Sequence, residues 1–528
     1  MVAAALWSLL FPGIRSVSAG VSLSLQEGPL RFYSGSSAEL TIELFGLPPE
    51  GEPSAVWKLM LGAAAVGEGE TRGERGEEGT AAVRARLDFP AVSRPVEVAW
   101  AVKIFAGGRP AAEEFFLFRV YPRDLAARLR AALAGKKPGV YDPRGKLFGL
   151  LDSAGVEYTA IHTPFGLRAF RGETLLVGPR AFSSPRESLF TLLEDSGVRG
   201  VLILDQAVFP GDLPCPVEPG DPISTPGGRS VAVASGHPVL DGLEGEDLPR
   251  TGPGVRPLKK PGRGRYRSLI DPAPLRPDSG GFLSLVLECL PGGRRLIFCQ
   301  IPLLGAVGRD PAADLLLANL VDLLFLPLEE PDPVFVIGGA GREERDFCRA
   351  MGLPGPRLSR PPGPYRQAIV FAGPGTVESL AGREDELVSS LGEMIESGGR
   401  LLLIGLDPET LPFWRPLLPE GLELAEYQPG AVSPPEDPLF RGISATDWEG
   451  CLRAASDYSI YQTTGEGIHP VAPLVGKADR GRGAVVICQF PFHRLLGEPA
   501  SAASAAQFIT NLGLAREPGP AGDKEAGR

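Results

Sequence analysis

The sequence predicts an α/β protein with an N-terminal all-β domain, namely a β-sandwich followed by two tandem, doubly wound α/β domains. Three patterns predict this fold class. Short runs over residues 20–122 alternate apolar and polar side chains, the chain after about residue 138 alternates continuous apolar runs with amphipathic segments, and this second stretch contains an internal repeat. Of the 528 residues, 43% are hydrophobic and 22% are charged, which is ordinary for globular proteins and excludes wholesale disorder.

The predicted β-sandwich occupies residues 20–122. Runs such as Ala38–Leu44, Thr80–Leu87 and Val96–Ile104 place apolar side chains at every second position, which is typical of half-buried antiparallel strands. Turn-rich segments separate these runs, and a length of about 100 residues fits an immunoglobulin-like sandwich.

The α/β part is predicted from buried strands that alternate with helices. Val201–Leu204 and Leu401–Ile404 are continuous apolar runs, as expected of parallel strands that are covered on both faces. Matched segments recur in one order at a nearly constant offset: 174–179 with 368–374, helical 187–196 with 385–397, 237–247 with 437–447, 295–302 with 484–491, and Asn319 with Asn511. We therefore assign two copies of one α/β domain to residues 138–328 and 332–515, with a linker at 327–333 and a disordered tail at 516–528.

The order of the repeated motifs carries a resemblance to a known family. In each copy a strand ends in Gly-Pro, a helix leads to a strand followed by Asp, a His/Asp-Pro turn comes next, and a strand ending Cys-Gln-x-Pro precedes a helix with Asn-Leu. This order resembles the class I glutamine amidotransferase-like fold, in the non-amidotransferase branch found in β-galactosidase trimerisation domains and in accessory domains of family-two glycoside hydrolases. The resemblance implies a tandem pair of flavodoxin-like domains. A sandwich ending in Phe118–Pro122 before such a domain is also similar to those glycosidases.

The chemistry of these families can be tested on the residues present. Class I amidotransferases place a nucleophilic Cys in a Gly-x-Cys-x-Gly turn and a His-x-Glu later, and none of the 6 cysteines or 4 histidines has that context. The similar glycosidases carry two carboxylates on a (β/α)8 barrel of about 250 residues, for which this chain has no room. We therefore predict no catalytic residue, no metal site and no cofactor. The resemblance implies a non-catalytic, carbohydrate-associated accessory or assembly protein of a bacterial cell envelope or secreted system.

Two other functions stay open. A glycoside hydrolase-like hydrolase could use carboxylates at the repeat crevice near Asp205 or Asp407, which requires one of them to face a second acid. A cell-envelope or transport auxiliary component is the third reading, since amidotransferase-like folds also occur there.

Six polar residues are candidates for ligand binding: Asp205, Gln206, His237, Gln300, Asp407 and Gln489. The repeat pairs Asp205 with Asp407, and both would follow parallel strands at their carboxyl ends, where open α/β sheets bind ligands. An Asp at such a position also commonly caps the next turn, and this interpretation is the simpler one for each residue.

The remaining candidates have local alternatives as well. His237 and Asp437 begin the same turn motif, which indicates a turn role that either side chain can fill by accepting a hydrogen bond. Gln300 and Gln489 follow buried strands, where they either reach the same crevice or bind nearby backbone groups.

Two further segments have an unusual composition. Arg250–Arg267 is basic and contains no acid, which fits either a polyanion-binding segment or a solvated loop. Gly338–Gly341 follows an apolar strand but lacks the spacing and the lysine of phosphate-binding loops, which predicts a tight strand-to-helix turn.

Residues 1–19 are a candidate signal peptide, because an apolar run is followed by a small-residue pattern that ends at Ala19. They predict a secreted or periplasmic protein, with a cytoplasmic location as the alternative. The net charge of −11 argues against nucleic-acid binding, and the absence of a long uninterrupted apolar run predicts no integral membrane span. The partner classes that remain are a carbohydrate or a protein, and an oligomer stays open.

Overall fold

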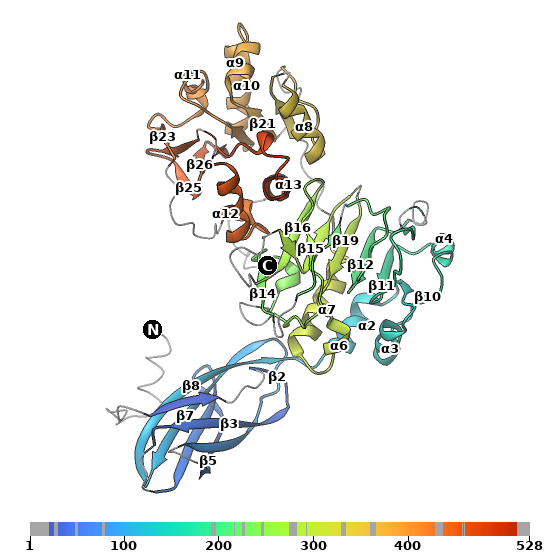
Figure 1. Ribbon diagram of the computed structural model, residues 1–528, viewed down its shortest axis with the longest axis vertical. Coiled ribbons are helices and arrows are strands. Elements are labelled where there is room, and N and C mark those ends of the chain that lie inside the picture. The colour runs from blue at the N-terminus through green and yellow to red at the C-terminus, as the bar shows by residue number, and fades with distance from the viewer. Residues whose placement is uncertain are drawn as a thin grey trace, which may run out of the picture. The chain divides into compact units, whose positions relative to one another are not determined.

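The structure is a computed structural model, and it describes residues 21–25, 30–47, 51–76, 80–189, 191, 197–215, 217–223, 228–243, 248–273, 282–291, 293–328, 334–339, 341–358, 366–427, 437–456, 458 and 460–514. The predicted signal peptide at 1–19 and the predicted tail at 516–528 lie outside these residues, as does most of the predicted helix 187–196. The described elements form a mixed α/β protein with an all-β part at its N-terminal end, as the sequence predicts (Figure 1).

The chain divides into two compact units. Unit 1 comprises residues 1–131, 241–249 and 303–319, and unit 2 comprises residues 132–240, 250–302 and 320–528. The all-β part therefore belongs to unit 1, and the two α/β sheets described below belong to unit 2.

Unit 1 contains an eight-stranded sheet with the order β1-β3-β6-β5-β4-β7-β8-β2. Neighbouring strands are antiparallel except for β2 and β8, which are parallel. The strands are β1 (Ser22–Leu25), β2 (Arg31–Tyr33), β3 (Ser37–Phe45), β4 (Pro53–Leu61), β5 (Ala64–Arg75), β6 (Ala81–Asp88), β7 (Val96–Ala106) and β8 (Arg109–Tyr121).

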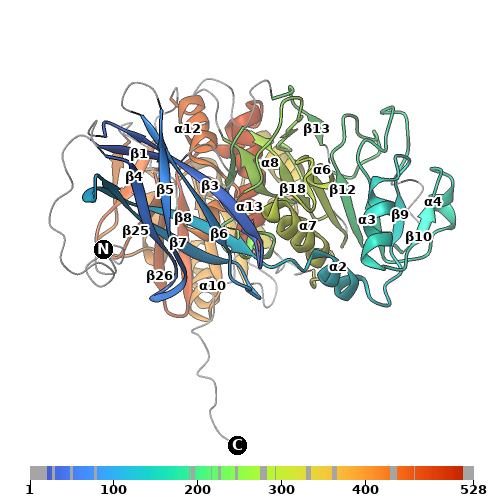
Figure 2. The same ribbon diagram turned by 90° about the horizontal axis from the view of Figure 1, so that it is seen from below.

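Strand β5 connects the two layers that the sequence predicts as separate sheets of a sandwich. Its residues up to Arg72 pair with β4, and Gly73–Arg75 pair with β6. A Cβ at Gly73 would lie 2.8 Å from the carbonyl oxygen of Ala82, so only glycine fits where β5 changes partner. The result is one continuous, curled sheet (Figure 2). Its core contains Trp100 and Phe118.

The first sheet of unit 2 has the order β10-β9-β11-β12-β19-β18-β16-β14. The first five strands are parallel and the last three are antiparallel to their neighbours. The strands are β9 (Gly139–Tyr141), β10 (Thr159–Ile161), β11 (Thr174–Val177), β12 (Gly200–Leu204), β14 (Ser230–Ala232), β16 (Tyr266–Pro272), β18 (Val286–Cys289) and β19 (Arg295–Cys299).

The second sheet of unit 2 has the order β20-β21-β22-β27-β26-β25. Its first four strands are parallel, and β26 and β25 are antiparallel to their neighbours. The strands are β20 (Val334–Ile337), β21 (Gln367–Phe371), β22 (Arg400–Ile404), β25 (His469–Ala472), β26 (Val475–Arg480) and β27 (Gly483–Cys488).

Helices and small strands complete the described fold. The α-helices are α2 (Leu125–Leu133), α3 (Lys146–Ala154), α4 (Gly166–Ala169), α6 (Leu303–Ala306), α7 (Pro311–Leu323), α8 (Arg342–Met351), α9 (Pro374–Ser379), α10 (Glu384–Glu396), α11 (Leu411–Trp414), α12 (Ala445–Ala454) and α13 (Pro499–Leu514). The remaining elements are the 3-10 turns η1 (Pro238–Leu240), η3 (Arg415–Leu417), η4 (Pro438–Phe440) and η5 (Phe492–Arg494), and the short strands β13 (Glu218–Pro219), β15 (Leu258–Lys259), β17 (Leu283–Ser284), β23 (Glu423–Glu426) and β24 (Tyr461–Thr464).

The two sheets of unit 2 share their strand order. The neighbouring strands β9-β11-β12-β19-β18-β16 of the first sheet correspond, in this order across the sheet, to β20-β21-β22-β27-β26-β25 of the second. Matched asparagines make matched contacts. The side-chain amide of Asn319 donates to the carbonyl oxygen of Asp241 at 2.9 Å, and that of Asn511 donates to the carbonyl oxygen of Arg441 at 2.7 Å. These contacts tie each Asn-Leu helix to the same point of the repeated turn motif.

Within the described ranges, no helix has the length and apolar character that a bilayer span requires. The same part of the chain contains no group of three or more His, Cys, Asp or Glu side chains that could hold a metal ion.

Candidate functional site

Asp205 has a strained backbone at the carboxyl end of a parallel strand. It follows β12 directly, its φ is 41°, and its backbone N–H donates to the carbonyl oxygen of Cys299 at 2.7 Å. In the second sheet Gly405 follows β22 in the same way, with a φ of 70° and an N–H that donates to Cys488 at 3.0 Å. The structural counterpart of Asp205 is therefore Gly405, and the pairing of Asp205 with Asp407 that the sequence predicts is wrong by two residues.

A second strained residue lies beside Asp205. Arg180 follows β11 with a φ of 50°, and its backbone N–H donates to the carbonyl oxygen of Asp205 at 2.9 Å. A non-glycine residue in a sparsely populated backbone conformation costs about 1–3 kcal/mol and persists only where its surroundings enforce it. The described residues contain five non-glycine positions of positive φ, and two of them meet here. Such strain clusters at functional sites, which makes this edge the leading candidate.

The charges of three basic side chains act on the carboxylate of Asp205. Burial raises the pKa of Asp205, and the charges of Arg180, Lys146 and Arg144 oppose that rise. All three basic residues are exposed, whereas Asp205 is half-buried. Among the described residues none forms a hydrogen bond with the carboxylate of Asp205, so its oxygens are available to a ligand. We call these four residues, Arg144, Lys146, Arg180 and Asp205, the Asp205 edge.

Asp142 positions the two basic residues that precede and begin α3. Its buried carboxylate accepts hydrogen bonds from the backbone N–H of Leu147 at 2.6 Å and of Arg144 at 3.2 Å. A Cβ on Gly178, in the next strand connection, would lie 2.4 Å from the Asp142 carboxylate. Glycine at 178 therefore allows Asp142 to cap the turn, and the cap fixes the backbone that carries Arg144 and Lys146.

The buried side chains of Gln206 and Gln300 hydrogen-bond backbone groups next to Asp205. The Gln206 amide oxygen accepts from the N–H of Ala181 at 2.9 Å, and its amide nitrogen donates to the carbonyl of Gly178 at 2.7 Å. The Gln300 amide oxygen accepts from the N–H of Gln206 at 2.8 Å, and its nitrogen donates to the Gln206 carbonyl at 2.8 Å. Both side chains are buried and bound to backbone groups, which makes them positioning residues for the strained turn.

The second sheet uses its matched residues in a similar structural way. The Gln489 amide nitrogen donates to the carbonyl oxygen of Leu406 at 2.7 Å. The Asp407 carboxylate accepts from the N–H of Glu409 at 2.9 Å and of Thr410 at 2.8 Å, so it caps the turn before α11. The turn-capping interpretation of Asp407 thus agrees with its contacts.

His237 lies in the turn that the sequence assigns to it. Its Nδ1 accepts from the N–H of Val239 at 3.3 Å, just as the Asp437 carboxylate accepts from the N–H of Leu439 at 2.9 Å. The Nε2 of His237 lies 3.5 Å from the buried Glu288 carboxylate. Burial lowers the pKa of His237, so the ring is neutral in this environment near neutral pH.

Glu288 forms the centre of a buried ionic cluster. Its carboxylate lies 2.8 Å from Nε of Arg295 and 3.5 Å from a guanidinium nitrogen of Arg267. Burial raises the pKa of Glu288, but its contacts with His237, Arg267 and Arg295 outweigh burial and lower it to about 2. Because Arg295 also donates to the carbonyl oxygens of Leu323 at 2.6 Å and Leu326 at 2.7 Å, this cluster secures the end of α7.

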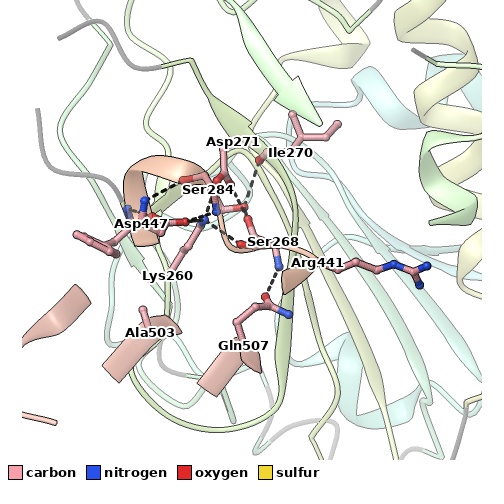
Figure 3. A network of polar contacts seen from close by, with 12 residues as sticks. Lys260, Ser268, Ile270, Asp271, Ser284, Arg441, Asp447, Ala503 and Gln507 are labelled. Atoms are coloured by element: carbon pink, nitrogen blue, oxygen red, sulfur yellow. Dashed lines mark hydrogen bonds and ion pairs between the residues drawn. The ribbon is translucent and has the colours of Figure 1, made fainter. Parts of the chain in front are cut away.

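Lys260 lies in a second buried cluster, shown in Figure 3, between Asp271 and Asp447. Its Nζ is 2.6 Å from Asp271 Oδ2 and 2.5 Å from Asp447 Oδ2, and it donates to the carbonyl oxygen of Gly442 at 3.1 Å. Only 2% of the Lys260 side chain is exposed, which leaves no access for a substrate. The cluster fastens β16 to the start of α12.

The sequence does not reveal this cluster. Lys260 stands in the basic run Arg250–Arg267, and its acidic partner Asp447 is 187 positions away. Both interpretations of the run, polyanion binding and a solvated loop, are therefore wrong for Lys260, and Arg267 is likewise engaged with Glu288. The sequence marks Asp447 only as the end of the repeated turn motif, which does not indicate its partner.

The glycine turn after β20 faces a carboxylate. A Cβ on Gly338 would lie 3.0 Å from Oε2 of Glu344, and the N–H of Gly339 donates to the Thr376 hydroxyl at 3.0 Å. Burial raises the pKa of Glu344 to about 7, and the charge of Glu343 adds to this rise. An acid so close to the turn disfavours a phosphate, which agrees with the predicted strand-to-helix turn.

Comparisons with known proteins assign no family. No family model matches the chain, and no curated protein matches it. Among solved structures, an exo-β-1,4-mannosidase from Opitutaceae bacterium strain TAV5 is 13% identical, with 38% of this chain and 39% of that chain covered and a TM-score of 0.23. A β-glucosidase from Listeria innocua is 13% identical over 19% of this chain and 16% of that chain, with a TM-score of 0.14.

A small domain is also similar. A CARDB domain from Pyrococcus furiosus is 13% identical over 20% of this chain and 97% of that chain, with a TM-score of 0.14. The chain spans less than half the length of the two glycosidases. At TM-scores this low, the similarities assign neither a fold nor an activity to this chain.

Proposed function

We propose that this chain is a non-catalytic, carbohydrate-associated accessory or assembly protein of a bacterial cell envelope or secreted system, and that its ligand binds at the Asp205 edge. The observation that carries the proposal is the contact between two strained residues, Arg180 and Asp205, at the carboxyl ends of β11 and β12. Open α/β sheets bind ligands at this edge, and the Asp205 carboxylate has no hydrogen-bond partner among the described residues.

The chemistry of the edge suits a polyhydroxyl ligand. Each sugar hydroxyl can donate one hydrogen bond and accept others. Asp205 supplies acceptor oxygens, while Arg180, Arg144 and Lys146 supply donors from an exposed surface. The order of a β-rich part followed by α/β sheets, which is similar to certain glycosidases, supports the same ligand class.

Hydrolysis has no support at this edge. Glycoside hydrolysis needs two carboxyl groups about 5–10 Å apart, and the charged groups that act on the carboxylate of Asp205 are all basic. The nearby thiol of Cys299 is buried, and burial raises its pKa to about 12, which removes it as a nucleophile near neutral pH. Asp407, the other carboxylate considered for a hydrolase, caps a turn instead.

We also propose that the two sheets are tandem flavodoxin-like copies of the class I glutamine amidotransferase-like fold. The common strand order and the matched contacts of Asn319 and Asn511 support the proposal that the two sheets are copies of one domain. Superposition of experimental structures of the two halves tests it, and halves whose parallel strands fail to overlay would contradict it.

Export of the protein is a further part of the proposal. Cys215 and Cys289 form a disulfide, and disulfides form and persist mainly in oxidising compartments. A secreted or periplasmic location therefore agrees with the candidate signal peptide. Fractionation of cells that express the full chain tests this point, and retention of all of the protein in the cytoplasm would contradict it.

A glycan array probed with the full chain tests the proposed function. We expect binding to at least one class of oligosaccharide and no release of product from aryl glycosides. Binding to no glycan on a broad array would contradict carbohydrate association. Turnover that disappears in both Asp205→Asn and Asp407→Asn variants would instead support the hydrolase alternative.

A further inference from the structure

We propose that the sugar bound at the Asp205 edge is acidic: its carboxylate or phosphate group contacts Arg144, Lys146 and Arg180, and its hydroxyl groups donate to Asp205. This inference rests on the proposed function and narrows its ligand class. The four residues of the edge have a net charge of 3 − 1 = +2, and counting the Asp142 carboxylate that caps the turn of Arg144 gives 3 − 2 = +1, in a chain whose net charge is −11. A local excess of positive charge on an acidic protein favours an anionic ligand.

The position of Asp205 excludes a simple anion as the best ligand. Sulfate has no proton to donate to a carboxylate, and inorganic phosphate brings its one or two protons on the same group that carries its negative charge, which the carboxylate repels. In an acidic sugar, the hydrogen-bond donors and the negative charge lie on different groups. Ring hydroxyls can donate to Asp205 while the anionic group lies several ångströms away among the basic side chains. The combination of one acceptor and three cationic donors therefore fits a molecule with hydroxyl and anionic groups on one scaffold.

In the second sheet a glycine stands at the position of Asp205. Gly405 has the left-handed conformation of Asp205 at no steric cost and supplies no side chain. The turn after β20, which corresponds to the turn after β9, carries Glu344 against Gly338 and leads into α8 with Arg342 at its first position, so it holds an acid and a base. The fold thus forms the strained turn with glycine alone, and the charged, strained version in the first sheet needs a different reason, which ligand binding provides.

The rigidity of the turn supports a preformed site. Asp142 holds the backbone of Arg144, Gln206 and Gln300 fix the residues after β12, and Arg180 is bonded to Asp205. These contacts fix the backbone from which the side chains of Arg144, Arg180 and Asp205 extend before any ligand binds. Preorganisation of this kind lowers the entropy cost of association.

Calorimetric titration of the full chain with matched sugars tests the inference. The ligands are a uronic-acid oligosaccharide, its neutral counterpart, a sugar phosphate and inorganic phosphate. The test variant is Arg144→Gln/Lys146→Gln/Arg180→Gln. The matched control removes three exposed arginines from α8, as Arg342→Gln/Arg345→Gln/Arg349→Gln.

We expect the wild-type protein to bind one of the acidic sugars at least tenfold more tightly than the neutral sugar, and inorganic phosphate weakly. The edge variant loses this preference and binds both sugars with similar affinity, whereas the α8 variant keeps it. The two acidic ligands distinguish a carboxylate from a phosphate as the preferred group. Thermal unfolding of both variants confirms that they are folded.

Other results of the titration distinguish a failure of the acidic-sugar inference from a failure of the proposed function. Equal binding of acidic and neutral sugars by the wild-type protein, with loss of both in Asp205→Asn, overturns the inference and leaves the proposed function intact. A preference for acidic sugars that the edge variant retains also overturns the inference. Inorganic phosphate binding as tightly as the acidic sugar overturns it as well. Absence of binding to every sugar contradicts the inference and the proposed function together.

Discussion

Lys260 and Asp447, which are 187 positions apart in the sequence, form a buried ion pair with 2.5 Å between Nζ and Oδ2. Asp271 completes the cluster at 2.6 Å. The pair connects the segment after β15 to the first turn of α12, where Asp447 also forms a capping box with Ser444. A single lysine thus links segments that come from the two repeated halves.

Replacement of Lys260 by methionine is expected to lower the free energy of unfolding by about 3–5 kcal/mol, because it leaves two buried carboxylates without their cation. The neighbouring Lys259→Met is the matched control. Lys259 pairs with Glu218 at the surface, at 3.2 Å, and its loss should cost less than about 1 kcal/mol. Urea unfolding of the two variants measures the difference. Equal effects would show that the buried cluster contributes no more than a surface pair.

The cluster also predicts a pH dependence of stability. Burial raises the pKa of Asp271 from 3.8 to about 7, while the charge of Lys260 lowers it and that of Asp447 raises it. A group whose pKa is higher in the folded state contributes stability below its unfolded pKa, and this contribution is lost as the pH rises through 7. We therefore expect the wild-type protein to lose stability relative to Asp271→Asn between about pH 4 and pH 7. Parallel unfolding curves of the two proteins across this range would contradict the prediction.

Asp205→Gly is expected to stabilise the protein by about 1 kcal/mol, because glycine adopts a positive φ without strain. The reverse change in the second sheet, Gly405→Ala, should destabilise it by about 1 kcal/mol, since no atom closer than 3.9 Å would hinder the new Cβ and strain is the main cost. Chemical unfolding of both variants measures the two signs. A destabilised Asp205→Gly would show that the Asp205 side chain has a structural role, which would weaken the case for a ligand site.

The disulfide predicts a dependence of stability on redox conditions. Cys215 and Cys289 close a loop with a sequence separation of 74, and loss of a cross-link of this size costs about 4 kcal/mol through the entropy of the unfolded chain. A reducing agent should therefore lower the unfolding midpoint of the wild-type protein but not that of Cys215→Ser/Cys289→Ser. If reduction left the wild-type midpoint unchanged, the cross-link would have no part in stability.

The fold could be predicted from the sequence where local patterns determine it. The apolar runs 201–204 and 401–404 became β12 and β22, and the helix predicted at 385–397 is α10, Glu384–Glu396. The shared turn of His237 and Asp437 follows from the ability of both side chains to accept a hydrogen bond. Each of these features depends on neighbours within a few positions along the chain.

The candidate site could be predicted only in part. The sequence identifies Asp205 because a polar residue follows a buried strand. Its partner in the repeat is Gly405, however, since the strand ends are aligned by backbone hydrogen bonds and not by residue type. The basic residues of the edge lie on the loops after β9 and β11. These loops come close to Asp205 because β9, β11 and β12 are neighbours in the sheet, and the sequence does not show this strand order. The sequence does not predict the continuity of the β-rich sheet, because that continuity depends on close packing at Gly73 between strands that are distant in the sequence.

The central claim is that the ligand binds at Asp205 and that the second sheet has no equivalent site. Calorimetric titration of a sugar that binds the wild-type chain, repeated with Asp205→Asn and with Asp407→Asn, tests this claim most directly. The account predicts an affinity at least tenfold lower for Asp205→Asn and an unchanged affinity for Asp407→Asn. An unchanged affinity for Asp205→Asn, or an equal loss in both variants, would contradict it.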